Sequence, residues 1–437
     1  MDNELAYDYL VVGGGILGLA TAWALKKQCP QAAVGLATAG NLCDGTTSQA
    51  AALVTQGRSS ECAVRLAQDT LVAIDELDRE IELGLPYHRV GGLHLAKSDQ
   101  EHEALITMAS VADQCGIKTQ WLAIDEAKRK APQFNLEGFR SALWFEGDGY
   151  IDPVLLANAY GESAKAKGVE VHSGSRVAEL LAVNGTMRGV KLETDLDILA
   201  NHVIVCAGPW AANLLKPLGC SLPVAPVRSL YWMTERHEFN SALPVTIVPS
   251  AHGYFRKENQ SILFGVRDYP GLALHPDNVP DDVQSFAFSE DADGLNALSG
   301  NWDKLVSFWP QIEQLGLAHF ISGISTYSLD GLPVIGVPIS SKSADYSNKP
   351  MKGLTVVTGC SGAGIAYSAG IAKHAVQHAL NGHVPNELSF NRFSSETKSP
   401  AYDIHSRALA VNSEALCAYN ADFRQRCLRA RYNKKAG

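Results

Sequence analysis

The segment DYLVVGGGILGLATAWALKKQ, residues 8–28, decides the fold. Residues 8–12 form an apolar run with β-branched members, which is typical of a buried parallel strand, and residues 19–28 have helical spacing. Between them, Gly13, Gly15 and Gly18 form the pattern G-x-G-x-x-G, which combines a tight turn, close approach to a pyrophosphate and close packing of helix on strand. The sequence therefore predicts a dinucleotide site at the N-terminus of a helix.

One part of this dinucleotide pattern is missing. An acidic residue usually ends the second strand, about 20 positions after the glycines, and binds the ribose hydroxyls. The second strand is expected at residues 32–37, and Thr38 stands where the acid belongs. A single hydroxyl is a weaker partner than a carboxylate, so we expect looser binding of the adenosine.

The composition narrows the class of protein. The chain has 437 residues, 46% hydrophobic and 19% charged, and a net charge of −9, which excludes a disordered chain and argues against nucleic acid as a partner. No apolar run has the roughly 20 residues of a membrane span, and residues 1–9 lack a signal-peptide layout. The nine cysteines are scattered without a C-x-x-C pair, which indicates reduced thiols and no metal site. We expect a cytoplasmic protein.

Strand and helix patterns recur along the chain. A helix followed by a strand is expected within 149–181, and a strand, a glycine turn and a helix within 202–215. A strand-rich block runs from about 224 to 266, and residues 353–380 read as a strand, a glycine-dense turn and a helix. The Rossmann-like pieces thus surround a second domain that is itself split in two.

Nine segments in register resemble the D-amino-acid oxidase superfamily of FAD-dependent oxidoreductases, whose members include glycine oxidase, sarcosine oxidase and dimethylglycine dehydrogenase. The resemblance spans roughly residues 8–383. The segments are VVGGGILGLATAWAL (11–25), GTTSQAAAL (45–53), GGLHLA (91–96), GDGYIDPVLLANAY (147–160), VIVCAGPWAANLL (203–215), LPVAPVR (222–228), GYFRKENQSILFGV (253–266), LDGLPVIG (329–336) and GLTVVTGCSGAGI (353–365).

The resemblance implies an α/β fold in which a Rossmann-like FAD-binding domain is interleaved with a smaller antiparallel-sheet substrate domain. We expect the FAD-binding domain to comprise residues 1–85, 149–222 and 328–385. The substrate domain comprises 86–148 and 223–327, and residues 386–437 form a C-terminal extension.

The resemblance also implies which residues hold the FAD. The pyrophosphate lies on residues 13–18, the adenine lies near Val177, and the isoalloxazine ring lies between residues 46–53 and 361–365. The helix that follows the second glycine turn directs its positive end to the flavin N1/C2 edge. The expected cofactor-binding residues are Gly13, Gly14, Gly15, Ile16, Leu17, Gly18, Thr38, Thr46, Thr47, Ser48, Gln49, Ala51, Leu53, Val177, Ala207, Gly208, Trp210, Gly336, Ser361, Gly362, Ala363, Gly364 and Ile365.

The two positions at which relatives attach FAD covalently hold other residues here. A histidine of dimethylglycine dehydrogenase-like sequences aligns with Gln49, and the linking cysteine of sarcosine oxidase-like sequences falls near Gly323. We therefore expect non-covalent FAD.

Substrate recognition departs from the family pattern at two positions. Glycine oxidase-like members use an arginine to bind the substrate carboxylate where this chain has Ser325, which puts a standard α-amino acid in doubt. Sarcosine oxidases have a lysine that helps dioxygen react where this chain has Leu263, which tilts the reading toward a dehydrogenase.

The expected catalytic residues are His252, Tyr254, Arg256 and Tyr327. The first three alternate along one expected strand and would share a face above the flavin. Arg256 would bind an anionic group of the substrate and His252 would accept a proton from its ammonium. The alternative for both is a structural role. Tyr327 belongs to the segment expected to line the cavity on the flavin's re face.

The leading hypothesis is an FAD-dependent enzyme that oxidises the C–N bond of an amine or N-substituted amino-acid-like substrate to an imine by hydride transfer to flavin. The electron acceptor is dioxygen or a redox partner. The alternatives are a hydroxy-acid dehydrogenase of the same fold and a non-catalytic FAD-binding partner subunit. The basic stretch 422–435 is a candidate for weak contact with a membrane surface or a subunit, against the plainer reading of a solvated helix end.

Overall fold

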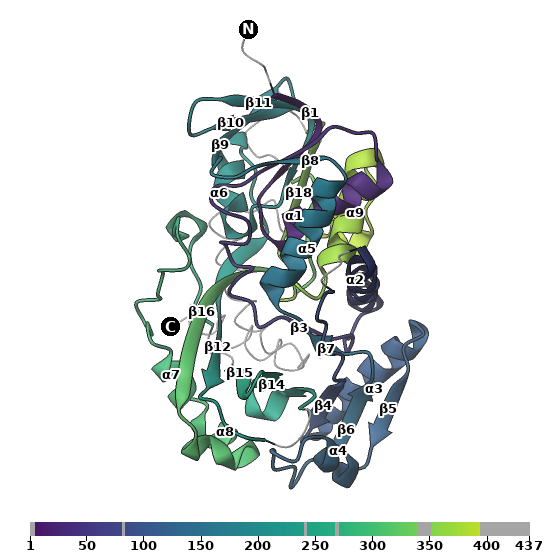
Figure 1. The fold of residues 1–437 in the computed structure, drawn as a ribbon, viewed down its shortest axis with the longest axis vertical. Helices are drawn as coiled ribbons and strands as arrows, with labels where there is room; N and C mark the ends of the chain where they lie inside the picture. Colours follow the sequence, from purple (N-terminus) through teal and green to yellow (C-terminus); the bar gives the residue numbers. More distant parts are fainter. Residues whose placement is uncertain (1–4, 81–83, 240–242, 267–270, 339–350, 394–437) are drawn as a thin grey trace, which may run out of the picture.

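The computed structural model describes residues 5–80, 84–239, 243–266, 271–338 and 351–393. Two large sheets lie at opposite ends of the long axis of the molecule, and a short two-stranded sheet of β3 (Leu53–Val54) and β7 (Gly149–Tyr150) lies between them (Figure 1). The chain passes repeatedly from one large sheet to the other, so residues from distant parts of the sequence meet where the sheets adjoin.

The first sheet is a Rossmann-like sheet with the order β17-β18-β11-β1-β2-β8. Its central pairs are parallel, and Leu10 and Val11 in the middle strand are fully buried, as a strand covered on both faces requires. The strands are β1 (Leu5–Val12), β2 (Val34–Ala37), β8 (Val169–His172), β9 (Val177–Val183), β10 (Thr186–Leu192), β11 (Asp197–Val205), β17 (Val334–Gly336) and β18 (Leu354–Thr358), with β9 and β10 paired off the edge of β11.

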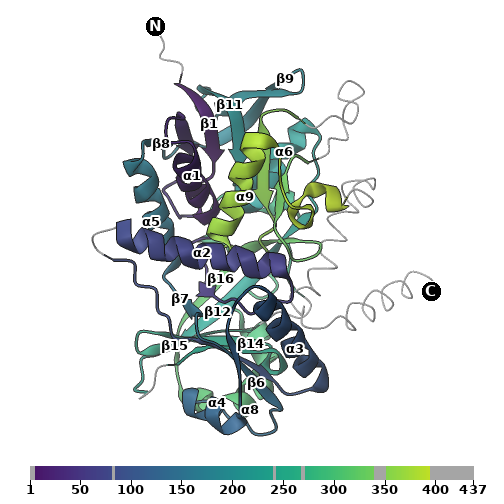
Figure 2. The ribbon, with the colours of Figure 1, turned by 90° about the vertical axis from the view of Figure 1, so that its right-hand side faces the viewer.

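Helices cover one face of this sheet with a single hydrophobic core (Figure 2). Trp23 and Tyr160 meet edge to face at 5.2 Å in that core, and Asp152 caps one helix by accepting hydrogen bonds from the backbone N–H groups of Val154 and Leu155. The helices are α1 (Ile16–Gln28), α2 (Glu61–Glu80), α5 (Pro153–Ala166) and α9 (Ser368–Asn381), and α6 (Ala211–Leu215) packs on the other face.

The second sheet has the order β16-β12-β15-β14-β13-β4-β6-β5. It is antiparallel except for the parallel pair β4–β13. One face carries an aromatic core in which Phe134, Phe255, Phe264 and Trp309 pack together. The strands are β4 (Gly92–Ala96), β5 (Thr119–Leu122), β6 (Ser141–Phe145), β12 (Val224–Thr234), β13 (Val245–Val248), β14 (Gly253–Glu258), β15 (Ser261–Val266) and β16 (Leu317–Ser328), and the helices are α3 (Asp99–Gln114), α4 (Ile124–Lys130), α7 (Leu295–Ser299) and α8 (Trp302–Phe308).

A buried ion pair fixes the long connection between β15 and β16 to this sheet. The side chains of Arg228 in β12 and Asp291 are 1% and 4% exposed, and their charged atoms lie 2.9 Å apart. Burial opposes ionisation of Asp291, but hydrogen bonds from the backbone of Asn296 and from Arg228 outweigh it and lower the pKa of the carboxyl. The charged pair is satisfied on both sides and anchors the loop that precedes α7.

The structure confirms the expected α/β fold with a Rossmann-like sheet and a largely antiparallel second sheet. The strands of the second sheet fall in residues 86–148 and 223–327, except that β16 runs one residue further to Ser328. The division into domains at those boundaries stays a prediction. Residues 386–393, expected in the extension, contribute Phe390 and Phe393 to the core of the first sheet. The basic stretch 422–435 lies outside the described residues. None of the described helices is long and apolar enough to cross a membrane.

One helix boundary differs from the expectation. The glycine-dense turn does not open α9 directly, because residues 361–367 are turns and the helix begins at Ser368. The backbone N–H of Tyr367 donates to the Ala363 carbonyl, which makes one isolated helical turn before the regular helix. The expectation that the helix starts at the glycines is wrong by about one turn.

Candidate functional site

A cavity of about 860 Å³ lies at the carboxyl ends of the central strands of the first sheet. Ligands of open α/β sheets bind at this edge, and the volume falls in the range of about 300–1,000 Å³ typical of ligand pockets. Six parts of the chain far apart in the sequence form its wall: residues 12–17, 37–50, 175–193, 206–214, 279–284 and 325–365. The cavity therefore exists only in the folded chain.

The three glycines of the first turn have separable roles. Gly13 has a φ of +118°, and a Cβ there would overlap the carbonyl of Cys206. A Cβ on Gly18 would overlap the carbonyl of Gly13. Gly15 has an ordinary φ of −82°, and its Cβ would meet only the Thr47 hydroxyl at 3.1 Å. The protein itself thus needs Gly13 and Gly18, whereas Gly15 keeps space open for a ligand.

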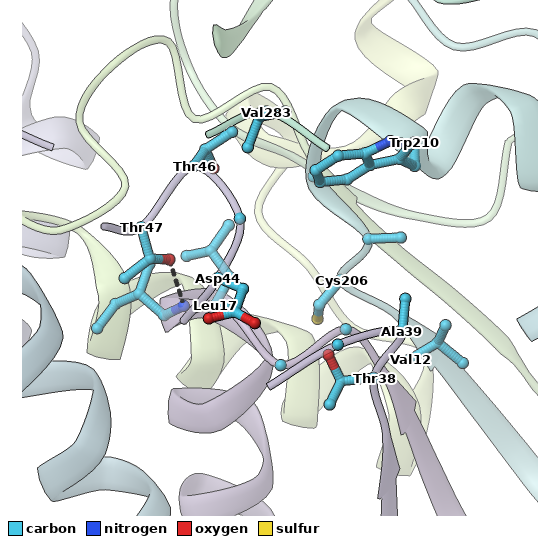
Figure 3. A pocket seen from close by; sticks show the side chains of 18 of the residues that line it. Val12, Leu17, Thr38, Ala39, Asp44, Thr46, Thr47, Cys206, Trp210 and Val283 are labelled. Carbon is cyan, nitrogen blue, oxygen red and sulfur yellow. Dashed lines mark hydrogen bonds between the residues drawn. The ribbon is translucent and has the colours of Figure 1, made fainter. Parts of the chain in front are cut away.

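The N-terminus of α1 faces this cavity with its positive dipole end. Its first turn has no acidic residue, and the N-cap Gly15 makes no side-chain hydrogen bond. The Thr47 hydroxyl instead accepts a hydrogen bond of 2.9 Å from the backbone N–H of Ile16, and this bond is drawn in Figure 3. Thr47 therefore fixes the helix end at which an anionic group would bind.

The end of the cavity next to β2 holds Thr38 and charged side chains. Thr38 directly follows β2, is 9% exposed and lines the cavity. Asp44, which sequence reasoning missed, also lines it and is labelled in Figure 3; its carboxylate accepts a hydrogen bond of 2.9 Å from the backbone N–H of Asn41. Arg176 lines it as well. Its guanidinium forms ion pairs with Glu193 at 3.5 Å and with Asp281 at 3.2 Å. Thr38 thus stands where an acidic residue is usual, and the acidic side chains at this end come from other segments of the chain.

The opposite end is built from β16 and the second glycine turn. Ser325, Thr326, Thr358 and Cys360 line it. Among the described residues, the buried hydroxyls of Thr326 and Thr358 have no hydrogen-bond partner, so a polar ligand would satisfy them. Burial raises the pKa of the Cys360 thiol, which keeps it protonated and uncharged at neutral pH. This end offers neutral hydrogen-bonding groups.

The structure brings most of the expected cofactor residues to one cavity. Gly13, Gly14, Gly15, Ile16, Leu17, Thr38, Thr46, Thr47, Val177, Ala207, Gly208, Trp210, Gly362, Gly364 and Ile365 line it, whereas Gly18, Ser48, Gln49, Ala51, Leu53, Gly336, Ser361 and Ala363 do not reach its wall.

Two of the residues outside the wall are structural in this chain. Gly18 allows α1 to pack on β1, as described above. Gly336 has a φ of +130° and lies beside His378 and Phe390, at the side of the sheet packed by α9. Tyr327, expected as a catalytic residue, lies next to the wall, because a Cβ on Gly362 would sit 2.8 Å from its hydroxyl.

Arg256 and Tyr254 lie in β14, on the face of the second sheet that contacts residues 49–53 through Arg256. Of these residues Ala50 lines the cavity, and neither Arg256 nor Tyr254 lies in its wall. The Arg256 side chain is buried at 3% exposure, and its Nε donates a hydrogen bond of 2.7 Å to the Ala51 carbonyl. Its Nη1 pairs with Glu258, and its guanidinium lies 4.6 Å from the Tyr150 ring. Among the described residues its Nη2 has no partner, which leaves one donor group for a ligand.

The expectation that His252 shares the face of Arg256 is wrong. His252 precedes β14 in a left-handed conformation with a φ of +51°. Its Nδ1 lies 3.0 Å from the Asn301 side chain, and Lys304 of α8 lies within 3.1 Å of its ring. These partners belong to the opposite face, where Phe255 packs. The period-two argument failed because the strand begins one residue after His252.

Tyr231 is a residue of this face that sequence reasoning missed. It lies in β12 and is 6% exposed. Burial raises the pKa of Tyr231, and Arg256 lowers it by a smaller amount. Burial likewise raises the pKa of Tyr150 beside the same guanidinium. Both phenols therefore stay protonated at neutral pH. Alternation along β12 could have placed Tyr231 on this face. No motif in the sequence marked it as a residue of the site.

The comparisons with known proteins agree with this geometry. The family described as FAD dependent oxidoreductase matches residues 8–378. The chain belongs to this family. It is 25% identical over 85% of its length to a 4-methylaminobutanoate oxidase (formaldehyde-forming) of Paenarthrobacter nicotinovorans, covering 43% of that protein. It is 27% identical over 76% of its length to a glycine oxidase of Geobacillus kaustophilus, covering 84% of that protein.

Solved structures show the same fold. An L-proline dehydrogenase from P. horikoshii superposes with a TM-score of 0.76 at 20% identity, over 90% of this chain and 99% of that one. Several curated relatives are much longer, because this chain covers 36% of human sarcosine dehydrogenase at 26% identity and 43% of the methylaminobutanoate oxidase. The chain thus spans less than half the length of these relatives.

The matched family is one of FAD-dependent proteins, and the cavity fits that cofactor. The open space at Gly15, the free helix end of α1 and the unpartnered hydroxyls of Thr326 and Thr358 offer a phosphate cradle and polar contacts at two ends of one cavity. Within the described ranges, no group of three or more His, Cys, Asp or Glu side chains is placed to hold a metal ion.

We predict that Gly15→Val and Gly18→Ala separate cofactor binding from folding. Gly15→Val should lose most of its FAD with little change in the stability of the FAD-free protein, since its side chain enters the ligand space. Gly18→Ala should lower the free energy of unfolding by about 1–3 kcal/mol, because the added methyl strikes the Gly13 carbonyl. Absorbance at the flavin band and thermal unfolding of FAD-free protein measure the two effects. Full flavin content in Gly15→Val would show that the motif is misread.

We predict that acid precipitation releases the FAD into the supernatant. The two positions of covalent attachment in relatives meet in this structure, since a Cβ on Gly323 would lie 3.0 Å from the Gln49 Cβ, and neither residue has a nucleophilic side chain for the linkage. Absorbance of the supernatant and pellet at the flavin band is the measurement, and yellow colour that stays with the precipitated chain contradicts the prediction.

Proposed function

We propose that the protein oxidises the C–N bond of an amino-acid-like amine that carries an anionic group, with FAD bound in the 860 Å³ cavity. The observation that carries this proposal is the guanidinium of Arg256. Its Nε donates to the carbonyl of Ala51, which adjoins Ala50 of the cavity wall, and its Nη2 has no partner among the described residues. A buried guanidinium with a free donor edge suits a carboxylate or similar anion.

The named activities of the relatives support this substrate class. The methylaminobutanoate oxidase, the sarcosine dehydrogenase and the glycine oxidase are all named for substrates with an amine and a carboxylate. Ser325 lines the cavity in β16 where an arginine binds the carboxylate in glycine oxidase-like members, so the anion must be bound elsewhere. Arg256 is the candidate.

Three residues of the site bear on the protonation of the substrate amine. FAD, when bound, supplies the acceptor for the two electrons and the hydrogen removed from the substrate carbon. Tyr150, Tyr231 and Cys360 keep their protons at neutral pH because burial raises the pKa of each. None of these three accepts the ammonium proton. The groups that burial keeps protonated thus serve this end of the site as hydrogen-bonding groups.

A residue on the same face of the second sheet as Arg256 bears on the choice between oxidase and dehydrogenase. Leu263 in β15 lies directly opposite Arg256 in the antiparallel register, so both side chains point to one side of the sheet. Leu263 is 1% exposed. It stands where sarcosine oxidases have a lysine that assists dioxygen, and this supports a dehydrogenase that passes electrons to a redox partner.

The test of the proposed function is anaerobic reduction of the bound flavin. A panel of N-methyl amino acids, D-amino acids, neutral amines and 2-hydroxy acids is added to the purified holoenzyme, and bleaching of the flavin band is followed. Bleaching by an amine that carries an anion, with release of ammonia or a primary amine, supports the proposal. Bleaching by hydroxy acids alone would establish the hydroxy-acid alternative.

We predict that Arg256→Ala lowers kcat/KM roughly 10- to 100-fold for an anionic amine, because a charge-assisted hydrogen bond is lost. The loss should be smaller with a neutral amine. FAD content is measured in parallel, since Arg256 also holds the Ala51 carbonyl. Arg256→Lys is the matched control, which keeps the charge and loses the fork geometry. Equal losses with charged and neutral substrates would assign Arg256 a structural role only.

We predict that His252→Ala leaves the pH profile of kcat/KM unchanged and its value within about twofold. The imidazole lies with Asn301 and Lys304 on the face of the sheet that is turned away from Arg256. Substitutions of this kind usually change the free energy of unfolding by about 0.5 kcal/mol or less, so the variant should fold as the parent does. A lost acidic limb in the pH profile would show that His252 accepts the substrate proton after all.

A further inference from the structure

One segment of the chain, Pro276–Gln284, begins with a 3-10 turn at Pro276–Asn278 and continues without regular structure along the FAD cavity. It belongs to the connection between β15 and β16, which Figure 1 shows in green along the side of β16. Five of its nine residues line the cavity, and Figure 3 shows Val283 at the cavity beside Thr46. We call this segment the clasp. Since it forms part of the wall, a ligand inside the cavity is enclosed on that side.

Side chains from the opposite wall hold the clasp by its backbone. Three carbonyls of the clasp accept hydrogen bonds from amide or indole donors, all from residues at or beside the first sheet. These bonds run from Asn213 Nδ2 to the Pro276 carbonyl at 2.9 Å, from Trp210 Nε1 to the Pro280 carbonyl at 2.9 Å and from Gln49 Nε2 to the Val283 carbonyl at 2.7 Å.

Side chains of the clasp also form hydrogen bonds and ion pairs with the same wall. Gln284 Nε2 donates a hydrogen bond of 3.1 Å to the Asp44 carbonyl. Asp281 pairs with Arg176 at 3.2 Å at the end of the cavity next to β2. The Asp281 side chain is 86% exposed, so this ion pair contributes little by itself. The hydrogen bonds to backbone atoms therefore carry most of the attachment.

The far end of the clasp is fixed to the second sheet. Val283 packs with Phe288 and Ile324 in a small buried cluster that Trp210 also touches. Beyond it, the buried pair of Arg228 and Asp291 anchors the loop, as described above. The clasp thus has one firm attachment through apolar packing and a buried ion pair. Its other attachment consists of hydrogen bonds and of exposed ion pairs, which include Lys216 with Asp277 at 2.7 Å. The second is the side that can open.

We propose that the clasp retains FAD, and that Trp210, Asn213 and Gln49 are positioning residues that keep it closed. The inference rests on the assignment of the cavity to FAD. The clasp compensates for Thr38, which replaces the usual ribose carboxylate, by enclosing the cofactor mechanically. FAD then leaves only when the clasp detaches from these three donors, so the rate of detachment limits the rate of FAD release.

Two of the three donors were expected to bind FAD themselves. Gln49 and Trp210 instead direct their polar atoms to the clasp, while the Trp210 ring lies against Gly45, whose Cβ would be 3.5 Å from it. Trp210→Phe therefore removes only the indole N–H and keeps a ring in the wall. Gln49→Met removes the amide and keeps a side chain of similar length.

The experiment measures FAD dissociation and hydrogen exchange on the same holoenzymes. FAD release after dilution is followed by the fluorescence of free flavin, and exchange of the amides of residues 277–284 is followed by mass spectrometry. One neutral hydrogen bond corresponds to about a fivefold change. Trp210→Phe should release FAD about fivefold faster and the double variant with Gln49→Met about 25-fold faster, with matching increases in exchange confined to the clasp.

Ser285→Ala is the matched control. The Ser285 hydroxyl bonds to Asp282 within the same loop and does not cross to the opposite wall, so release should stay within about twofold of the parent. Gln284→Ala tests the clasp from its own side, in case the Trp210 variants fold poorly, and should also speed release.

Two results would overturn the clasp. FAD release that stays within twofold in the double variant would show that clasp detachment does not limit it. Faster release with unchanged exchange at 277–284 would show that the donors act on FAD directly. Failure of the pocket assignment looks different, because Gly15→Val would then keep its FAD while the clasp variants changed only hydrogen exchange.

Discussion

The contact between Gly18 and the carbonyl of Gly13 is the constraint on which the rest of the structure depends. It brings α1 directly onto the end of β1, with no room for a single methyl group. That approach aims the first N–H groups of the helix at the cavity, and Thr47 from the next loop secures them through Ile16. The position of the cofactor cradle follows from this one turn, and the other walls are built around it.

The two ends of the cavity offer different interactions to a ligand. The phosphate end uses backbone groups and a helix dipole, which are insensitive to side-chain identity once the glycines are in place. The other end uses buried hydroxyls, a protonated thiol and, across the face of the second sheet, one guanidinium whose charge is shared with Glu258. Burial keeps Tyr150 and Tyr231 neutral there. Under the proposed function, Tyr150 and Tyr231 therefore serve binding and orientation of the substrate and do not accept its proton.

The enclosing side of the cavity belongs to the second sheet and not to the sheet that carries the cradle. The clasp spans this junction, fixed by apolar packing at Val283 and held loosely through its carbonyls. Outside the 3-10 turn Pro276–Asn278 the clasp has no regular secondary structure, so its carbonyls need donors from elsewhere. Trp210 and Asn213 supply them from the short helical region after β11. Retention of the cofactor and formation of the substrate face therefore depend on the same junction.

The sequence by itself determined the elements whose signals are local. The glycine pattern at 13–18, the strand before it and the helix after it could be predicted because sterics and hydrophobic period act within a few residues. The order of the family segments determined the two-sheet fold. Only the tertiary structure decided which face Arg256 and His252 take, because one residue of left-handed backbone at His252 breaks the period-two rule. It also decided that Gln49 and Trp210 reach the clasp, over 234 and 70 residues of chain. Such contacts between loops leave no periodic pattern in the sequence, since their geometry is set by the packing of sheets that are themselves assembled from distant segments.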